Sequence, residues 1–95
     1  MHSNLSNYKI IFSRSSEKFL EKLDEQSRIS ILKKVKELRD NSKNLDIKKL
    51  KSNFKLYRLR VGNFRVVYSV KHERVIIYIV AIDYRKDVYK SLNLA

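Results

Sequence analysis

The sequence contains no cysteine, no proline and no tryptophan, and only one of its 95 residues is glycine. Without cysteine the chain has no disulfide framework and no thiolate site for zinc, which is compatible with a reducing, cytoplasmic location. The absence of proline and the single glycine argue against flexible linkers and against many sharp turns. We therefore expect a single domain over residues 1–95.

Long hydrophobic runs are also missing. The longest, Val75–Ile82, has the length of a strand and is far too short to cross a membrane. Residues 1–7 hold no apolar stretch, so the sequence predicts no signal peptide. We expect no membrane partner.

Acidic residues are scarce, because 10 Asp and Glu stand against 22 Lys and Arg and the formal net charge is +12. Such an excess points to an anionic partner: nucleic acid, an anionic membrane surface or an acidic protein. A solvated, lysine-rich surface from a biased genome is the simpler alternative. Hydrophobic residues make up 43% of the chain, which is enough to build a core beneath this charge.

The first half of the chain predicts one strand and two helices. Tyr8–Phe12 is a short apolar run typical of a strand, and a helical pattern follows over Glu17–Leu23. Asp24 can cap a second helix that ends near Asn41. Residues 41–53 read as a polar loop. Serines that offer N-cap oxygens to the first helix are Ser13, Ser15 and Ser16; apolar positions on the second helix are Ile29, Ile31, Leu32, Val35 and Leu38; the expected loop anchors are Leu45, Ile47 and Leu50.

The second half changes to the period of strands. Residues 55–61 and 64–70 alternate between apolar and other side chains, and residues 75–82 are apolar on both faces, as in a strand that is covered on both sides. Gly62 and Asn63 predict a two-residue hairpin turn between the first two strands. A short helix from about Arg85, with Asp83 as its N-cap, closes the chain. The sequence predicts an α+β fold of order βααβββ, with two antiparallel helices on a mainly antiparallel sheet.

A two-residue turn fixes the register of this hairpin. It places Arg60 directly opposite Arg65 and puts Arg58 on the same face, while the other face is almost wholly apolar. Like charges directly opposite are destabilising, so folding does not need this pair. Arginine grips phosphate oxygens with a planar fork, and the face therefore predicts anion binding rather than a chance basic strand.

Tyr89 lies four residues after Arg85, so the two side chains would share one face of a helical turn. Nearby positive charge would lower the pKa of Tyr89, which suits it to proton transfer or to stacking on a base, although a packing aromatic is the simpler interpretation. His2 and His72 have no visible partner. No acidic cluster, Gly-rich phosphate loop or Ser/His/Asp set is apparent, so we expect no metal site and no cofactor.

The string Leu56–Tyr68, preceded by Lys49-Leu50 and resumed at residues 83–89, resembles the RelE/ParE superfamily of toxin–antitoxin toxins. The element order resembles the family over nearly the whole chain. The resemblance implies a compact RelE-like βααβββ fold with a short C-terminal helix. RelE-type members cleave mRNA in the ribosomal A site by attack of the ribose 2′-hydroxyl on the adjacent phosphate, whereas ParE-type members poison DNA gyrase.

All five motif positions of the RelE type are filled compatibly, and arginine replaces lysine at two of them. The resemblance therefore implies a metal-independent, ribosome-dependent endoribonuclease with a RelB-like acidic antitoxin as partner. A gyrase poison and a non-catalytic module that binds RNA or the ribosome are the alternatives. The residues expected to be catalytic are Arg58, Arg60, Arg65, Arg85 and Tyr89; those expected to bind RNA are Lys49, Lys51, Lys55, Lys71 and Lys86.

Overall fold

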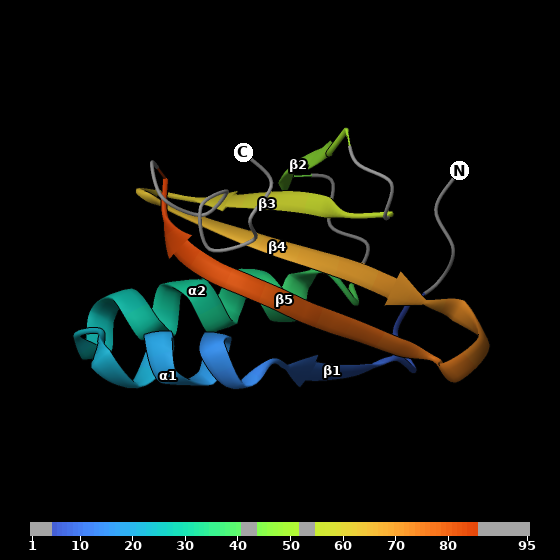
Figure 1. Cartoon of the computed structure of the whole chain (residues 1–95), viewed down its shortest axis with the longest axis horizontal. Helices are drawn as coiled ribbons and strands as arrows, with labels where there is room; N and C mark the ends of the chain where they lie inside the picture. Colours follow the sequence, from blue (N-terminus) through green and yellow to red (C-terminus); the bar gives the residue numbers. More distant parts are fainter. Residues whose placement is uncertain (1–4, 41–43, 52–54, 86–95) are drawn as a thin grey trace.

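The computed structural model describes residues 5–40, 44–51 and 55–85. Its strands form one five-stranded sheet in the order β1-β5-β4-β3-β2, in which β1 is parallel to β5 and the other neighbours are antiparallel (Figure 1). The expected α+β class is confirmed. In chain order the elements are β1 (Lys9–Phe12), α1 (Arg14–Lys22), α2 (Glu25–Glu37), β2 (Asp46–Lys49), β3 (Tyr57–Val61), β4 (Phe64–Lys71), a 3-10 turn (His72–Arg74) and β5 (Ile76–Tyr84).

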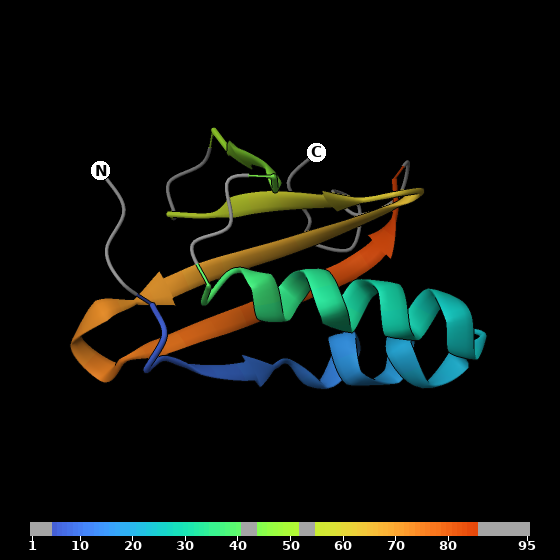
Figure 2. The same ribbon diagram turned by 180° about the vertical axis from the view of Figure 1, so that it is seen from behind.

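Both helices cover the same face of the sheet. Strand β5 passes in front of α2 in Figure 1, and α2 passes in front of β5 when the molecule is seen from behind in Figure 2. Helix α1 packs against β5 and α2 packs against β3, so the main core lies between the helices and the sheet. The opposite face of the sheet carries no described helix.

Ser13 fastens the start of α1 to β5. Its Oγ accepts a hydrogen bond from the backbone N–H of Ser16 at 3.1 Å, which caps the helix, and it donates to the carbonyl of Val80 at 2.8 Å. The hydroxyl of Ser16, which is fully buried, lies 2.8 Å from the same Oγ. One serine therefore satisfies a helix terminus and a strand carbonyl together.

Helix α2 begins as predicted and buries the predicted apolar positions except Ile29. Asp24 accepts a hydrogen bond from the backbone N–H of Ser27, and hydrogen bonds with Ser27 lower the pKa of its carboxyl. The buried positions are Ile31, Val35 and Leu38, whereas Ile29 is 57% exposed. Three-residue steps rotate by about 300° each, so Ile29, at the start of such a series, lies off the core that Val35 and Leu38 reach, whereas the steps of four and three residues from Ile31 stay on the core.

The polar stretch after α2 contains a strand that we did not predict. Residues Asp46–Lys49 form β2, which pairs with β3 at the edge of the sheet, and all four residues are exposed. Of the expected loop anchors, Leu45 packs on the main core and Leu50 on a smaller cluster, but Ile47 is 41% exposed. Short, charged edge strands carry almost no hydrophobic signal, which explains the error.

The β3–β4 hairpin confirms the predicted register. Val61 pairs with Phe64 and Arg60 pairs with Arg65 across a turn in which Gly62 has φ +56°, a left-handed conformation that glycine adopts without strain. The alternating apolar positions of both strands face the helices. Within that face Leu59 and Val66 are fully buried.

Strand β5 lies between β1 and β4 and contains an irregularity that changes its phase. Val67 pairs with Ala81 and the next residue, Tyr68, pairs with Ile79, so Val80 is an extra residue in β5. Before this bulge the core side chains include Ile79, and after it the core side chain is Ile82. Residues beyond the bulge consequently point to the opposite face from the one that simple alternation predicts.

We predict that Ser13→Ala lowers the free energy of unfolding by about 1–2 kcal/mol, because it removes the cap of α1 and leaves the Val80 carbonyl without this donor. Urea denaturation measures the change. Ser15→Ala, at an exposed neighbouring serine, is the matched control and should change stability by no more than about 0.5 kcal/mol. Equal losses in both variants would contradict the role assigned to Ser13.

Candidate nucleic-acid interface

Three of the predicted site residues meet on the sheet face away from the helices. Arg58 and Arg60 come from β3 and Arg65 comes from β4, directly opposite Arg60. Their exposure differs strongly: Arg60 is exposed, the Arg58 side chain is 14% exposed, and Arg65 is only 9% exposed. The face therefore presents one accessible arginine beside two that are largely enclosed. We call Arg58, Arg60 and Arg65 the arginine face.

Carboxylates flank the opposed arginines on both sides. Asp46 of β2 pairs with Arg60, Arg60 pairs with Arg65, and Arg65 pairs with Asp83 of β5. Because directly opposite residues of antiparallel strands share a face, these four side chains form one row across the sheet, in the order acid, arginine, arginine, acid. The two outer carboxylates reduce the repulsion between the two inner cations.

Strand β2 adds an ion pair to the arginine face. Nη2 of Arg58 donates to Oδ1 of Asp46 at 2.8 Å, and the Asp46 side chain is 54% exposed. Lys48, the next residue of β2 on this face, pairs directly with Arg58. Neither Asp46 nor Lys48 was expected here, because the sequence of β2 reads as a loop. The only signal was the alternation of Leu45 and Ile47 with charged residues.

The bulge at Val80 decides what β5 contributes. It shifts Ala81 and Asp83 to the arginine face, where Asp83 lies opposite Arg65. The prediction that Asp83 caps a C-terminal helix is wrong, because Asp83 lies inside β5 and its Oδ1 accepts a hydrogen bond from the backbone N–H of Tyr84 at 2.8 Å. Arg85 follows the end of β5, is exposed, and donates its backbone N–H to the carbonyl of Asn63 at 2.8 Å. Arg85 is thereby held beside the β3–β4 turn.

Two expected site residues, Tyr89 and Lys86, and the expected C-terminal helix lie outside the described residues. The other lysines are dispersed. Lys49 pairs with Tyr57, so it is on the helix side of the sheet. Lys71 ends β4, six residues from Arg65, which is about 20 Å along a strand.

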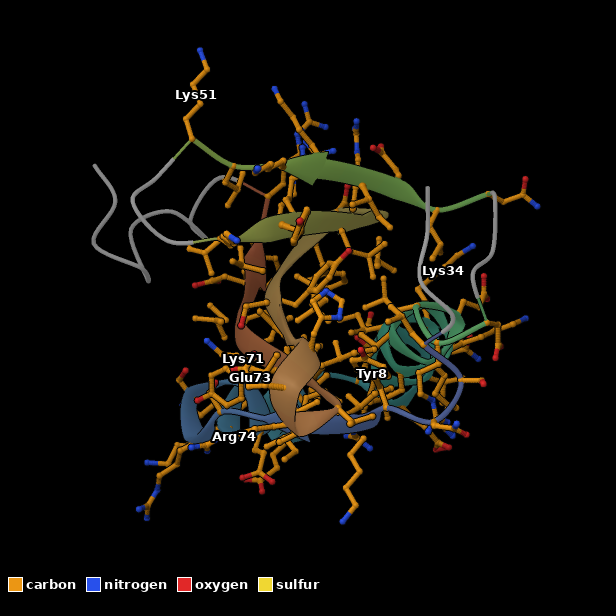
Figure 3. All side chains as sticks on the ribbon, turned by 90° about the vertical axis from the view of Figure 1, so that its right-hand side faces the viewer. Tyr8, Lys34, Lys51, Lys71, Glu73 and Arg74 are labelled. Carbon is orange, nitrogen blue, oxygen red and sulfur yellow. The ribbon has the colours of Figure 1, made fainter. Side chains whose placement is uncertain are left out.

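Figure 3 shows Lys71 beside the turn at the near end of the molecule and Lys51 far from it, after β2. Lys55 is exposed just before β3. The structure therefore brings together the arginines and does not gather the lysines into one patch with them.

Tyr68 and His72 do not supply a base at the arginine face, and Tyr78, which pairs with Ser69 of β4, is the described tyrosine on this side of the sheet. Tyr68 lies on the helix side, stacked on Tyr57 with ring centroids 5.5 Å apart, and burial raises its pKa to about 12. His72 does have a partner, since its Nδ1 lies 2.8 Å from the hydroxyl of Tyr8, but it belongs to the β4–β5 turn. Tyr68 therefore points to the other side of the sheet, and His72 lies beyond the end of β4.

A cavity of about 520 Å³ lies on the other side of the β3–β4 hairpin, between its turn and α2. Val61 and Phe64 contribute apolar walls, and Lys33 and Lys34 contribute cationic ones. Since Val61 and Phe64 face the helices, this cavity does not open onto the arginine face. Over residues 5–40, 44–51 and 55–85, no group of three His, Asp or Glu side chains is placed to hold a metal ion. In the same ranges no helix has the length and hydrophobicity needed to cross a membrane.

Comparison with known proteins assigns this arrangement to a family. The model of the ParE toxin of the type II toxin–antitoxin system parDE matches residues 10–89. The chain belongs to the RelE/ParE family of toxins. This toxin is 42% identical over 69 residues to a protein of Methanocaldococcus jannaschii named as a RelE1 toxin, and the match covers 65% of this chain and 77% of that protein.

Solved structures agree with this assignment. The toxin of the RelE–RelB complex from Pyrococcus horikoshii OT3 superposes with a TM-score of 0.71 and is 26% identical, over 83% of this chain and 96% of that chain. The RelB–RelE antitoxin–toxin complex from Methanococcus jannaschii gives a TM-score of 0.68 at 27% identity, over 85% and 96% of the two chains. The RelE-like fold expected from the sequence is confirmed.

We predict that Tyr68 makes the toxin lose stability as pH rises from 10 to about 12. The unfolded chain ionises this tyrosine near its ordinary pKa of 10.0, whereas burial in the folded chain holds the pKa at about 12, so alkaline pH favours unfolding through this window. Urea denaturation at about pH 9 and about pH 11 measures the loss. Between these two pH values the free energy of unfolding of Tyr68→Phe is expected to fall by less than that of the wild type. The other groups that titrate in this range, such as the lysines, are the same in both proteins, so the difference reports on Tyr68. Equal losses would contradict the assigned burial effect.

Proposed function

We propose that this toxin is an endoribonuclease that cleaves mRNA in the ribosomal A site, in the cytoplasm and without a metal ion. The observation that carries the proposal is the opposed pair of Arg60 and Arg65. Repulsion between directly opposite like charges opposes folding, so the pair is explained by an anion that binds both side chains. The RNA backbone supplies such an anion, because it carries one phosphate per nucleotide.

The chemistry suits a site of arginines. The ribose 2′-hydroxyl attacks the adjacent phosphorus, the bond to the 5′-oxygen of the next nucleotide breaks, and a 2′,3′-cyclic phosphate remains. Arg65 and Arg85 are proposed to neutralise the phosphate as it gains negative charge, and Arg58 and Arg60 to hold neighbouring phosphates. Arginine stays protonated at all ordinary pH values and therefore stabilises charge without transferring protons. Proton transfer, or stacking on a base, falls to Tyr89 in this proposal.

The proposed dependence on the ribosome follows from the lack of a strong base at the arginine face. A site that mainly stabilises charge gains most from a substrate whose 2′-oxygen, phosphorus and leaving oxygen are already in line. mRNA held in the A site of a 70S-type ribosome is such a positioned substrate. Free RNA is expected to be cleaved poorly for the same reason.

We predict that Arg60→Ala reduces mRNA cleavage by about 100-fold, the usual cost of one donor that stabilises a charged transition state. Arg60 is exposed, so its removal should leave the fold intact. Primer extension on mRNA from cells that express each variant measures the cleavage.

Arg74→Ala removes an exposed arginine from the distant β4–β5 turn and is the matched control (Figure 3). Arg65→Lys adds a second test, since it keeps the charge and removes the planar fork. Cleavage at the wild-type level in both Arg60→Ala and Arg65→Lys would refute the roles assigned to the arginine face.

A RelB-like antitoxin is the proposed protein partner. The toxins from Pyrococcus horikoshii and Methanococcus jannaschii were both solved in complex with RelB. The net charge of +12 here calls for an acidic partner, and we propose that this antitoxin covers the basic surface and competes with RNA. In that complex, carboxylates of the antitoxin would contact the arginine face in place of RNA phosphates.

We predict that the small protein encoded beside this gene is acidic and displaces RNA from the toxin. Fluorescence anisotropy of a labelled RNA bound to the toxin should fall as the antitoxin is added. The displacement should persist in a toxin that carries Arg74→Ala. A basic neighbouring protein, or an antitoxin that binds together with RNA, would rule out this form of inhibition.

A gyrase poison remains the second candidate, because the family model that matches residues 10–89 is described as a ParE toxin. DNA breaks that depend on gyrase, in cells whose mRNA stays intact, would establish it. RNA binding without any cut product would instead indicate a non-catalytic module. The arginine face favours the endoribonuclease, since a protein-binding poison has no evident need for opposed arginines.

A further inference from the structure

Arg58 and Asp46 form an ion pair in which the two partners are very unequally exposed. Nη2 of Arg58 lies 2.8 Å from Oδ1 of Asp46, and the exposed fractions of the two side chains are 14% and 54%. The arginine is therefore held in the sheet face, whereas the carboxylate stands largely in water on the edge strand. Water screens the attraction on the Asp46 side, so this carboxylate can leave at little cost.

The ion pair uses only part of the arginine. Nε of Arg58 is buried and has no hydrogen-bond partner among the residues that the structure describes. Nε and Nη2 share one edge of the guanidinium plane, and that edge fits two oxygens of a phosphate. Asp46 thus contacts one of the two donors with a single oxygen. A buried donor without an acceptor is costly, so the unused Nε points to an anion that binds this edge with two oxygens.

The surroundings of the pair are cationic. Lys48 lies directly opposite Arg58, and Arg60 lies two residues along β3 and directly opposite Asp46. Asp46 is therefore an anion set among three cations, diagonal to the arginine that it contacts. An RNA phosphate at the same place would meet the same three cations and would add the hydrogen bond that Asp46 leaves unmade.

We propose that Asp46 is an internal competitor for the phosphate-binding edge of Arg58. In the free toxin its carboxylate occupies this edge, and an RNA phosphodiester displaces it and takes both Nε and Nη2. The proposal rests on the proposed function in that it names RNA as the displacing anion. The consequence is that the toxin selects RNA over small anions. A single weak anion that displaces Asp46 only replaces one contact with another, whereas an RNA strand whose neighbouring phosphates also reach Arg60 makes several new contacts at once.

The test compares Asp46→Asn with Glu73→Gln in the full chain. Both variants remove one negative charge from an exposed side chain, but Glu73 belongs to the distant β4–β5 turn (Figure 3). The probe is a labelled 2′-O-methyl RNA of about six nucleotides, which lacks the attacking hydroxyl and cannot be cleaved. Fluorescence anisotropy over a series of salt concentrations gives Kd, and urea denaturation checks that each variant is folded.

Asp46→Asn is expected to bind the probe several-fold more tightly than wild type and than Glu73→Gln. The slope of log Kd against log salt concentration should also steepen by about 0.7, the value for one more phosphate contact on a single strand. Unchanged affinity relative to Glu73→Gln would overturn the proposal. Weaker binding would do so as well, since Asp46 would then position Arg58 rather than compete for it.

A second measurement needs no variant. The Nε–H signal of Arg58 in a nitrogen–proton NMR spectrum should shift when the probe is added to wild-type toxin, because this proton then gains an acceptor. A signal that does not respond while the probe binds elsewhere would overturn the proposal. The two proposals can fail separately. If wild-type toxin cleaves no mRNA in cells but its Arg58 Nε–H signal still shifts when the probe is added, the proposed nuclease activity is refuted and the proposed competition between Asp46 and RNA is not.

Discussion

The register of the β3–β4 hairpin determines most of what this toxin presents to its surroundings. The two-residue turn at Gly62 and Asn63 places Arg60 opposite Arg65, and it also sends the alternate side chains of both strands into the main core. Because successive strand residues point to opposite faces, a slip of one residue would exchange the two sets. The same register thus buries Leu59 and Val66 and places the arginines on the other face. The hydrophobic core that favours this register therefore also fixes the geometry of the arginine face.

This coupling explains how the sheet tolerates repulsion. The core behind the hairpin holds Arg60 and Arg65 together whether or not an anion is present, and the carboxylates of Asp46 and Asp83 flank them within the same row. In the folded toxin, the charges of Arg60 and Arg65 are therefore partly balanced by the protein's own carboxylates. Each anion that binds meets arginines that are already placed, so little side-chain entropy is lost on binding.

Sequence patterns predicted the fold and the arginine face well, because both depend on strong alternation and on a turn with a clear glycine signal. They failed where the alternation of apolar and polar residues is weak, or where a bulge interrupts it. Strand β2 is four exposed residues long, so Asp46 and its ion pair with Arg58 could not be foreseen. The phase of β5 changes at Val80, and no residue type marks a bulge of this kind, so Asp83 was assigned to a helix cap rather than to the arginine face.

The bulge at Val80 also has a consequence for how the protein would respond to the loss of one residue. Deleting Val80 would remove the extra residue and straighten β5, and it would leave Asp83 opposite Arg65, because every other pairing between β4 and β5 is kept. The carbonyl that receives the Ser13 hydroxyl would be lost in the same event. A deletion at this position would therefore loosen the attachment of α1 to the sheet, while the row formed by Asp46, Arg60, Arg65 and Asp83 would keep its arrangement.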